Sequence, residues 1–124
     1  MMLQQDIPED YVIASGIQYS VRDFIKLSAK ALELKLEFRG EGKDEIATVI
    51  SSNKKLTPKI NVGDIIVRVS ERYFRPAEVE TLLGDASKAK KDLGWIPEIS
   101  LEDMCLEMIE NDLSKAKKRS LDEA

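Results

Sequence analysis

The stretch EIATVISSNKKLTPKINVGDIIVRVS, residues 45–70, decides the fold, because it holds two strand-like runs around a polar loop. Residues 45–51 and 64–70 are rich in β-branched side chains, which favour strands. In the second run Ile65, Val67 and Val69 alternate with other side chains, as expected for a half-buried strand. The polar segment between the runs predicts an exposed loop.

The residues upstream predict two further strands and a helix. The runs LEFR (36–39) and DYVIAS (10–15) read as short strands. Ser20 and Asp23 have the spacing of a capping box, and a helical apolar period follows them. The opening MMLQQDIPED begins with apolar residues and has no cap, so residues 1–9 are interpreted as the tail of a truncated helix.

Two helices are predicted downstream. Asp85 or Ser87 can cap a helix that ends at Gly94. A second capping pattern at Ser100 opens the longest helix. The spacing of apolar residues along this helix predicts that its methionines and the single cysteine pack in the core. The apolar side comprises Leu101, Met104, Cys105, Met108, Ile109, Leu113 and Ala116.

The basic cluster after this apolar side is explained by the negative end of the helix macrodipole. It consists of Lys115, Lys117, Lys118 and Arg119. Residues 115–124 are expected to form a basic and polar tail.

Length and composition predict one α/β domain over residues 1–124, with short strands and about three helices. The chain has 43% hydrophobic and 34% charged residues, a globular composition. A net charge of −4 argues against nucleic-acid binding. No apolar run is long enough to cross a membrane and the start has no signal-peptide pattern, so we expect a cytoplasmic protein.

Several catalytic chemistries are excluded by residue type. The chain has one cysteine and no histidine, which excludes internal disulfides, zinc clusters and histidine bases. Gly40 and Gly42 follow a predicted strand, but Glu45 stands where a dinucleotide fingerprint needs its third glycine. No tyrosine has a lysine four residues later, so the acid–base pair of short-chain dehydrogenases is absent.

The stretch RYFRPAEVETLLGD, residues 72–85, is a candidate anion-binding site. The planar guanidinium of Arg75 suits diphosphate oxygens, and Pro76 fits the first position of a helix. Glu78 would lie one turn along and could accept hydrogen bonds from hydroxyl groups. An ordinary Arg–Glu pair within a helix explains the same spacing, so the residues alone leave both interpretations open.

Several segments in order resemble the C-terminal part of GDP-mannose 4,6-dehydratase, a family of the extended short-chain dehydrogenase/reductase superfamily. They are MLQQDIPEDYVIASG, YSVRDF, RYFRPAEVETLLGD, SKAKKDLGWIPEISLEDM and MIENDL. The LGW-P pattern identifies the superfamily, whereas RPAEV joined to LLGD is specific to the GDP-mannose enzyme.

The resemblance implies a substrate-binding domain without its Rossmann domain. NADP and the catalytic residues would then lie outside this chain, which would carry no catalytic, cofactor or metal residue and would be inactive alone. In the family the matching arginine and glutamate hold the GDP portion of GDP-mannose, here Arg75 and Glu78, with Tyr73 and Arg72 as further candidates. The family's lyase reaction yields GDP-4-dehydro-6-deoxy-mannose, in the route to GDP-fucose and GDP-rhamnose type sugars.

Alternative functions remain open at this point. A separately encoded Rossmann half could dock on the chain and complete a split enzyme. The chain could instead be a non-catalytic module for nucleotide-sugar binding or protein interaction, or the remnant of an interrupted gene. We expect weak GDP-mannose binding, and self-association through the apolar face that the missing domain would cover.

Overall fold

The computed structural model describes residues 1–75 and 82–123, and their contacts fall into two units. One unit contains residues 1–19 and 82–100, and the other contains residues 20–75 and 101–123. Both helices and strands are present, in agreement with the α/β class predicted from the sequence.

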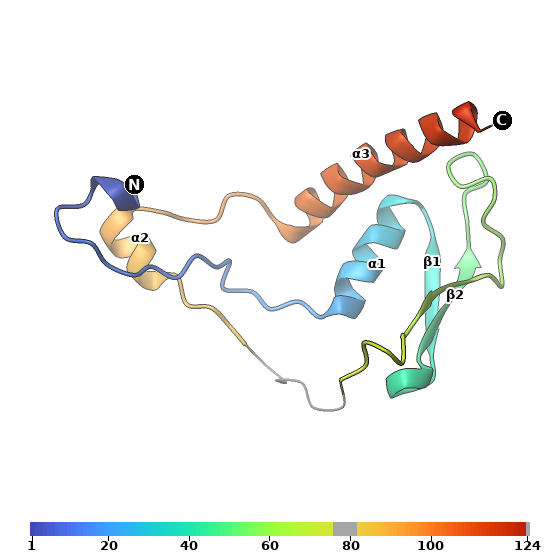
Figure 1. The fold of residues 1–124 in the computed structure, drawn as a ribbon, viewed down its shortest axis with the longest axis horizontal. Helices are drawn as coiled ribbons and strands as arrows, with labels where there is room; N and C mark the ends of the chain where they lie inside the picture. The colour runs from blue at the N-terminus through green and yellow to red at the C-terminus, as the bar shows by residue number, and fades with distance from the viewer. Residues whose placement is uncertain (76–81, 124) are drawn as a thin grey trace. The chain divides into compact units, whose positions relative to one another are not determined.

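The larger unit is built on a three-stranded antiparallel sheet in the order β1-β2-β3 (Figure 1). The strands are β1 (Lys35–Arg39), β2 (Ile46–Ser51) and β3 (Ile65–Arg68), close to the three runs predicted. Ala47 and Val49 of the central strand are completely buried. Burial of these side chains supplies the apolar centre of the sheet.

The turn between β1 and β2 requires glycine. Gly40 has a φ of +83°, and a Cβ placed there would lie 2.5 Å from the carbonyl oxygen of Asp44. The chain then forms the short 3-10 helix η2 (Gly42–Asp44) before it enters β2. A side chain at position 40 would therefore force backbone atoms apart.

Helix α1 (Val21–Ala31) begins at the predicted capping box. The Ser20 hydroxyl accepts the backbone N–H of Asp23 at 3.0 Å, and the Asp23 carboxylate accepts the backbone N–H of Ser20 at 3.0 Å. Two of the unsatisfied N–H groups at this helix end are thereby paired. The sequence pattern located this helix start correctly.

Helix α3 (Leu101–Asp122) packs against α1, which also contacts β1. Cys105 is only 1% exposed, and its sulfur lies 3.2 Å from the hydroxyl oxygen of Ser28 on α1. Lys30 and Glu102 add an exposed ion pair between the two helices at 2.7 Å. The prediction that Cys105 is a buried small side chain is confirmed.

Two sequence expectations about this unit are wrong. Met104 and Met108 are 42% and 48% exposed, because α3 turns its Cys105 side toward α1. Ile65 is 39% exposed, so the alternation in β3 gives less burial than expected. The basic cluster that begins at Lys115 lies in the last turns of α3, as predicted for the end of this helix.

The smaller unit contains η1 (Met2–Gln4) and α2 (Ser87–Leu93), with extended chain around them. Helix α2 ends, as predicted, at Gly94 in the left-handed conformation with a φ of +67°. Residues 10–15 are not in a strand, because no described segment pairs with them. The isolated turn η1 is all the helical structure found within residues 1–9.

Polar contacts and one close approach tie the N-terminal segment to residues 82–100. The Lys88 ammonium lies 2.8 Å from the Glu9 carboxylate and 3.1 Å from the Asp10 carbonyl oxygen. A Cβ at Gly84 would lie 2.5 Å from the Cβ of Ala14, so glycine permits this approach. These contacts hold the segment although it lacks strand partners among the described residues.

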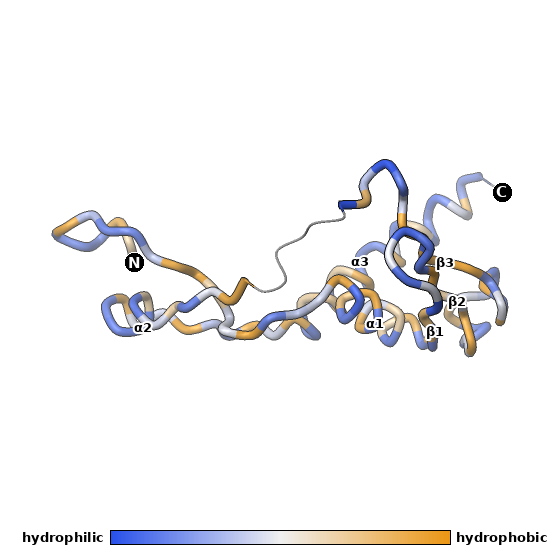
Figure 2. Tube along the Cα trace, turned by 90° about the horizontal axis from the view of Figure 1, so that it is seen from below, coloured by the Kyte–Doolittle hydropathy of each residue, from blue (hydrophilic) through white to orange (hydrophobic). Residues whose placement is uncertain are grey.

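The smaller unit exposes most of its large apolar side chains. Ala89 is its one fully buried residue among those the structure describes. Hydrophobic stretches recur along the chain on either side of α2 (Figure 2). Residues more than half exposed include Leu3, Ile7, Val12, Ile13, Ile17, Leu82, Leu83, Ile96 and Ile99.

We predict that Val49→Ala destabilises the chain by about 2 kcal/mol, because it removes buried methyl groups and leaves a cavity in the sheet. Urea unfolding followed by circular dichroism measures the change. Val62→Ala is the matched control, since Val62 is 66% exposed in the same unit. Equal effects of the two substitutions would contradict the assignment of β2 as the centre of the core.

Candidate functional site

The candidate anion site begins on an exposed turn that follows β3. The Tyr73 N–H donates to the Ser70 carbonyl oxygen at 3.1 Å, which closes this turn. The Arg72 guanidinium carbon lies 5.5 Å from the centroid of the Tyr73 ring, a cation–π distance. Tyr73 is 73% exposed, and Arg72 and Arg75 are exposed as well. Two guanidinium groups and an aromatic ring are thus displayed to solvent within four residues.

The turn is anchored to η2. A Cβ on Gly42 would lie 3.6 Å from the Phe74 ring, so this ring packs over the glycine. The Lys43 ammonium also lies 3.5 Å from the Glu71 carboxylate, an exposed pair of small energetic value. Phe74 therefore gives the arginine-bearing segment its position, a role that the sequence pattern did not reveal.

Part of the candidate motif lies outside the described residues. Pro76 and Glu78, with the helix expected to begin there, belong to residues 76–81, so the Arg75–Glu78 geometry stays a prediction. Arg75 has no hydrogen bond to any of the residues described. Its exposed guanidinium is available to an anion, which it can contact through two parallel N–H groups.

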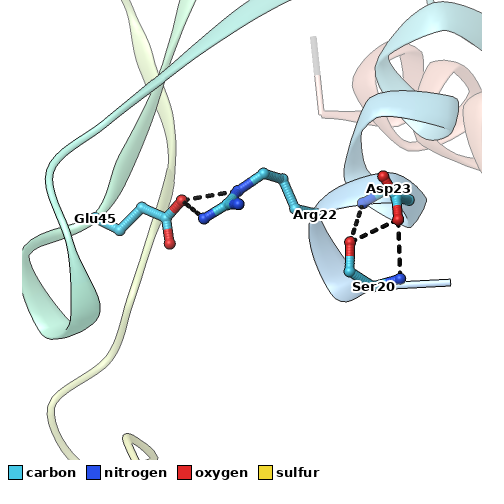
Figure 3. Close-up of polar contacts among 4 residues, drawn as sticks. All are labelled: Ser20, Arg22, Asp23 and Glu45. Atoms are coloured by element: carbon cyan, nitrogen blue, oxygen red, sulfur yellow. Dashed lines mark hydrogen bonds and ion pairs between the residues drawn. The ribbon is translucent and has the colours of Figure 1, made fainter. Parts of the chain in front are cut away.

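A pocket of about 680 Å³ lies within the same unit, at the N-terminal end of α1. It is lined by α1, by Phe38 of β1, and by segments of β2 and β3 that include Arg68. The Arg22 Nε donates to a Glu45 carboxylate oxygen at 2.9 Å beside this pocket (Figure 3). The Arg22 guanidinium carbon also lies 5.5 Å from the Phe38 ring centroid.

Sequence reasoning missed this pocket because its residues come from four separate elements. Arg22 follows a capping serine and Arg68 lies in a strand, and neither pattern signals a cavity. The carboxylate of Glu45 balances the charge of Arg22. The pocket has Arg68 as its remaining cationic side chain and is otherwise mostly apolar.

The capping box at the rim of this pocket lowers the pKa of its own carboxyl group, Asp23. Hydrogen bonds from the Ser20 side chain and backbone hold the pKa of the Asp23 carboxyl below its ordinary value. Nearby Lys26 and Arg22 act in the same direction. The ionised form of Asp23 is therefore favoured by the folded helix end (Figure 3).

The glycines near the site do not form a dinucleotide-binding turn. Gly40 and Gly42 connect two antiparallel strands through η2, whereas a dinucleotide fingerprint leads from a strand into a long helix. In the described part of the chain there is also no cluster of three or more possible metal ligands. Nor does any helix there have the length and apolarity needed to span a membrane.

These features define a class of protein, a small α/β protein that displays arginines beside an antiparallel sheet and has no cofactor-binding turn in its described residues. The family model described as GDP-mannose 4,6 dehydratase matches residues 1–108. The chain belongs to the GDP-mannose 4,6-dehydratase family, which confirms the resemblance seen in the sequence motifs.

Individual relatives agree with this assignment. The chain is 59% identical to GDP-mannose 4,6-dehydratase of Yersinia enterocolitica over 98% of this chain and 32% of the relative. It is 58% identical to the protein of the same name from Vibrio cholerae, with the same coverage. GDP-mannose 4,6 dehydratase 2 of Caenorhabditis elegans is 42% identical over 91% of this chain and 27% of the relative. The chain thus spans about a third of the length of these relatives.

We predict that Asp23→Asn reduces the loss of stability on acidification. Because the Asp23 pKa is lowered in the folded state, its contribution is present above the ordinary carboxyl pKa and is lost as pH falls through the folded value. Urea midpoints measured between about pH 6 and pH 3 should fall less steeply in the variant. Ser20→Ala, which removes the main cause of the shift, should flatten the profile in the same way. Wild-type slopes in both variants would refute this assignment.

Proposed function

We propose that this chain is the substrate-binding part of a GDP-mannose 4,6-dehydratase and holds the GDP portion of GDP-mannose. The observation that carries the proposal is the exposed Arg72–Tyr73–Arg75 segment, anchored by Phe74, in a chain of this family. Arg75 would clamp the diphosphate, while Glu78 would accept hydrogen bonds from the ribose. Tyr73 and Arg72 would lie near the same nucleotide.

The chemical steps are assigned to the part of the enzyme outside this chain. In the dehydratase reaction NADP supplies the hydride chemistry at the sugar, and a Rossmann domain would bind it. The sequence of this chain contains no dinucleotide fingerprint and no tyrosine–lysine pair at the required spacing. Its own contribution is to bind and orient the nucleotide, and we expect it to be inactive alone.

The exposed apolar side chains of residues 1–19 and 82–100 support a docking role for the smaller unit. Exposed apolar groups such as Val12, Ile13 and Leu83 favour burial against another protein surface. We propose that this surface receives the Rossmann half of the dehydratase, either in one longer chain or as a separately encoded protein. The assembled enzyme would act in the cytoplasm.

A non-catalytic binding module is the second candidate function. The same exposed arginines could hold a nucleotide sugar without any later reaction, and the docking surface could serve another protein. A remnant of an interrupted gene would have neither activity. Ligand binding separates the first two possibilities from the third, and reconstitution separates the first from the second.

We predict that Arg75→Ala weakens GDP binding by about 2 kcal/mol, or roughly thirtyfold, because it removes two charge-assisted hydrogen bonds to the diphosphate. Isothermal titration calorimetry with GDP and GDP-mannose measures the effect. Arg75→Lys should recover only part of the affinity, since an ammonium lacks the planar fork.

Arg39→Ala is the matched control, because Arg39 is an exposed arginine that pairs with Glu37 on β1. Its removal should leave GDP affinity unchanged. If Arg75→Ala binds GDP as tightly as the wild type, Arg75 is an ordinary surface residue. Absence of heat for the wild type at millimolar ligand would refute the binding function.

We further predict that mixing the chain with the N-terminal two thirds of a relative, such as the Yersinia protein, restores dehydration of GDP-mannose. Activity should require both parts, because neither has the complete nucleotide pocket and reaction centre. The 4-dehydro product can be followed by its absorbance in alkali. Activity of the relative's N-terminal part alone would contradict this division of roles.

A further inference from the structure

Helix α3 is charge-polarised along its length. Its first half, residues 101–111, contains four carboxylates and no lysine or arginine. Its second half, residues 112–122, contains four cations and two carboxylates. Each half therefore complements the opposite half of another α3 when two copies run antiparallel.

The second half of α3 is also poorly packed. Every residue from 114 to 123 is exposed, and Leu121 is 77% exposed. A helical end of this length is marginal in water without tertiary contacts. The helix macrodipole accounts for basic residues at this end, but it does not account for the exposed Leu121 there.

An apolar groove of about 500 Å³ runs beside this half of the helix. One wall is the loop between β2 and β3, residues 55–60, and the other is the C-terminal part of α3. Leu113, Ala116 and Leu121 contribute its apolar helical side. Lysines 55, 59 and 117 also line the groove, so its occupant should be apolar and acidic.

The first half of α3 has these properties. Leu106 is 44% exposed and is flanked by acidic residues, among them Glu110 one turn later. Leu106, Glu110, Leu113 and Lys117 are spaced four, three and four residues apart, which places them along one seam of the helix. This seam carries one carboxylate and one ammonium in addition to its leucines.

We propose that α3 is a self-association surface, on which two copies of this chain pair their α3 helices antiparallel about a two-fold axis near Leu113. In this arrangement Glu110 of each copy reaches Lys117 of the other. Leu106 of each copy enters the groove beside Leu121 of the other. The overlap of residues 106–121 is about 24 Å long, and the two-fold axis makes every contact twice.

The proposal is tested by charge exchange along the seam, with sedimentation velocity at several protein and salt concentrations. The wild type should form a dimer that weakens as salt rises. Glu110→Lys and Lys117→Glu should each raise the dimer dissociation constant at least tenfold, because attraction becomes repulsion at two symmetric pairs. The double variant E110K/K117E should dimerise like the wild type.

Mixing the two single variants gives the sharpest result. One variant then carries only cations at the two seam positions and the other carries only carboxylates, so a heterodimer should form where each variant alone is monomeric. Lys115→Glu, an equal charge change off the seam, should alter the dissociation constant by less than about threefold. Circular dichroism of every variant verifies that α3 is folded.

Two outcomes would overturn the proposal. One is a wild type that stays monomeric at all concentrations. The other is a dimer that persists in both single variants, since this would place self-association on the exposed apolar residues of the smaller unit. The test does not depend on GDP binding, so its failure and that of the proposed function are distinguishable.

Discussion

Burial of the central strand β2 is the constraint on which the larger unit depends. Both edges of β2 are hydrogen-bonded, and Ala47 and Val49 are withdrawn completely from water. Removal of apolar surface from water is the dominant favourable term in folding, and a doubly paired strand also satisfies its backbone groups. The contact of α1 with β1, and of α3 with α1, extends this core through Cys105 and Ser28. The position of the arginine-bearing turn follows from the end of β3 and from Phe74 over Gly42.

The smaller unit has the opposite balance of burial and exposure. Its N-terminal segment is held by polar contacts of Lys88 and by the close approach of Gly84 to Ala14. Its large apolar side chains are mostly exposed. Exposed ion pairs contribute little to stability, so such a unit gains most from an additional apolar surface. In the proposed enzyme the part that carries the reaction would supply this surface.

Local patterns predicted many elements because the relevant interactions are local. The capping box at Ser20, the stop at Gly94 and the three strands of the sheet each depend on neighbouring residues or on side-chain alternation. The run at residues 10–15 has the same β-branched composition, yet it forms no strand because a strand requires a partner. Met104 and Met108 have the helical spacing expected of core residues, but both side chains are nearly half exposed. The reason is that the contact of α3 with α1 decides which face of α3 is buried.

The sequence alone determined the α/β class, the family motifs and the residue types available for binding, and it excluded histidine bases, disulfides within the chain and zinc clusters. It could not determine which residues from distant segments share a surface. The tertiary structure decided that Phe74 anchors the arginine-bearing turn, that Arg22 meets Glu45 beside a pocket, and that α3 carries a groove along its basic half. The physical reason is that capping, periodicity and composition act over a few residues, whereas burial and pockets arise from segments that meet only after the chain has folded.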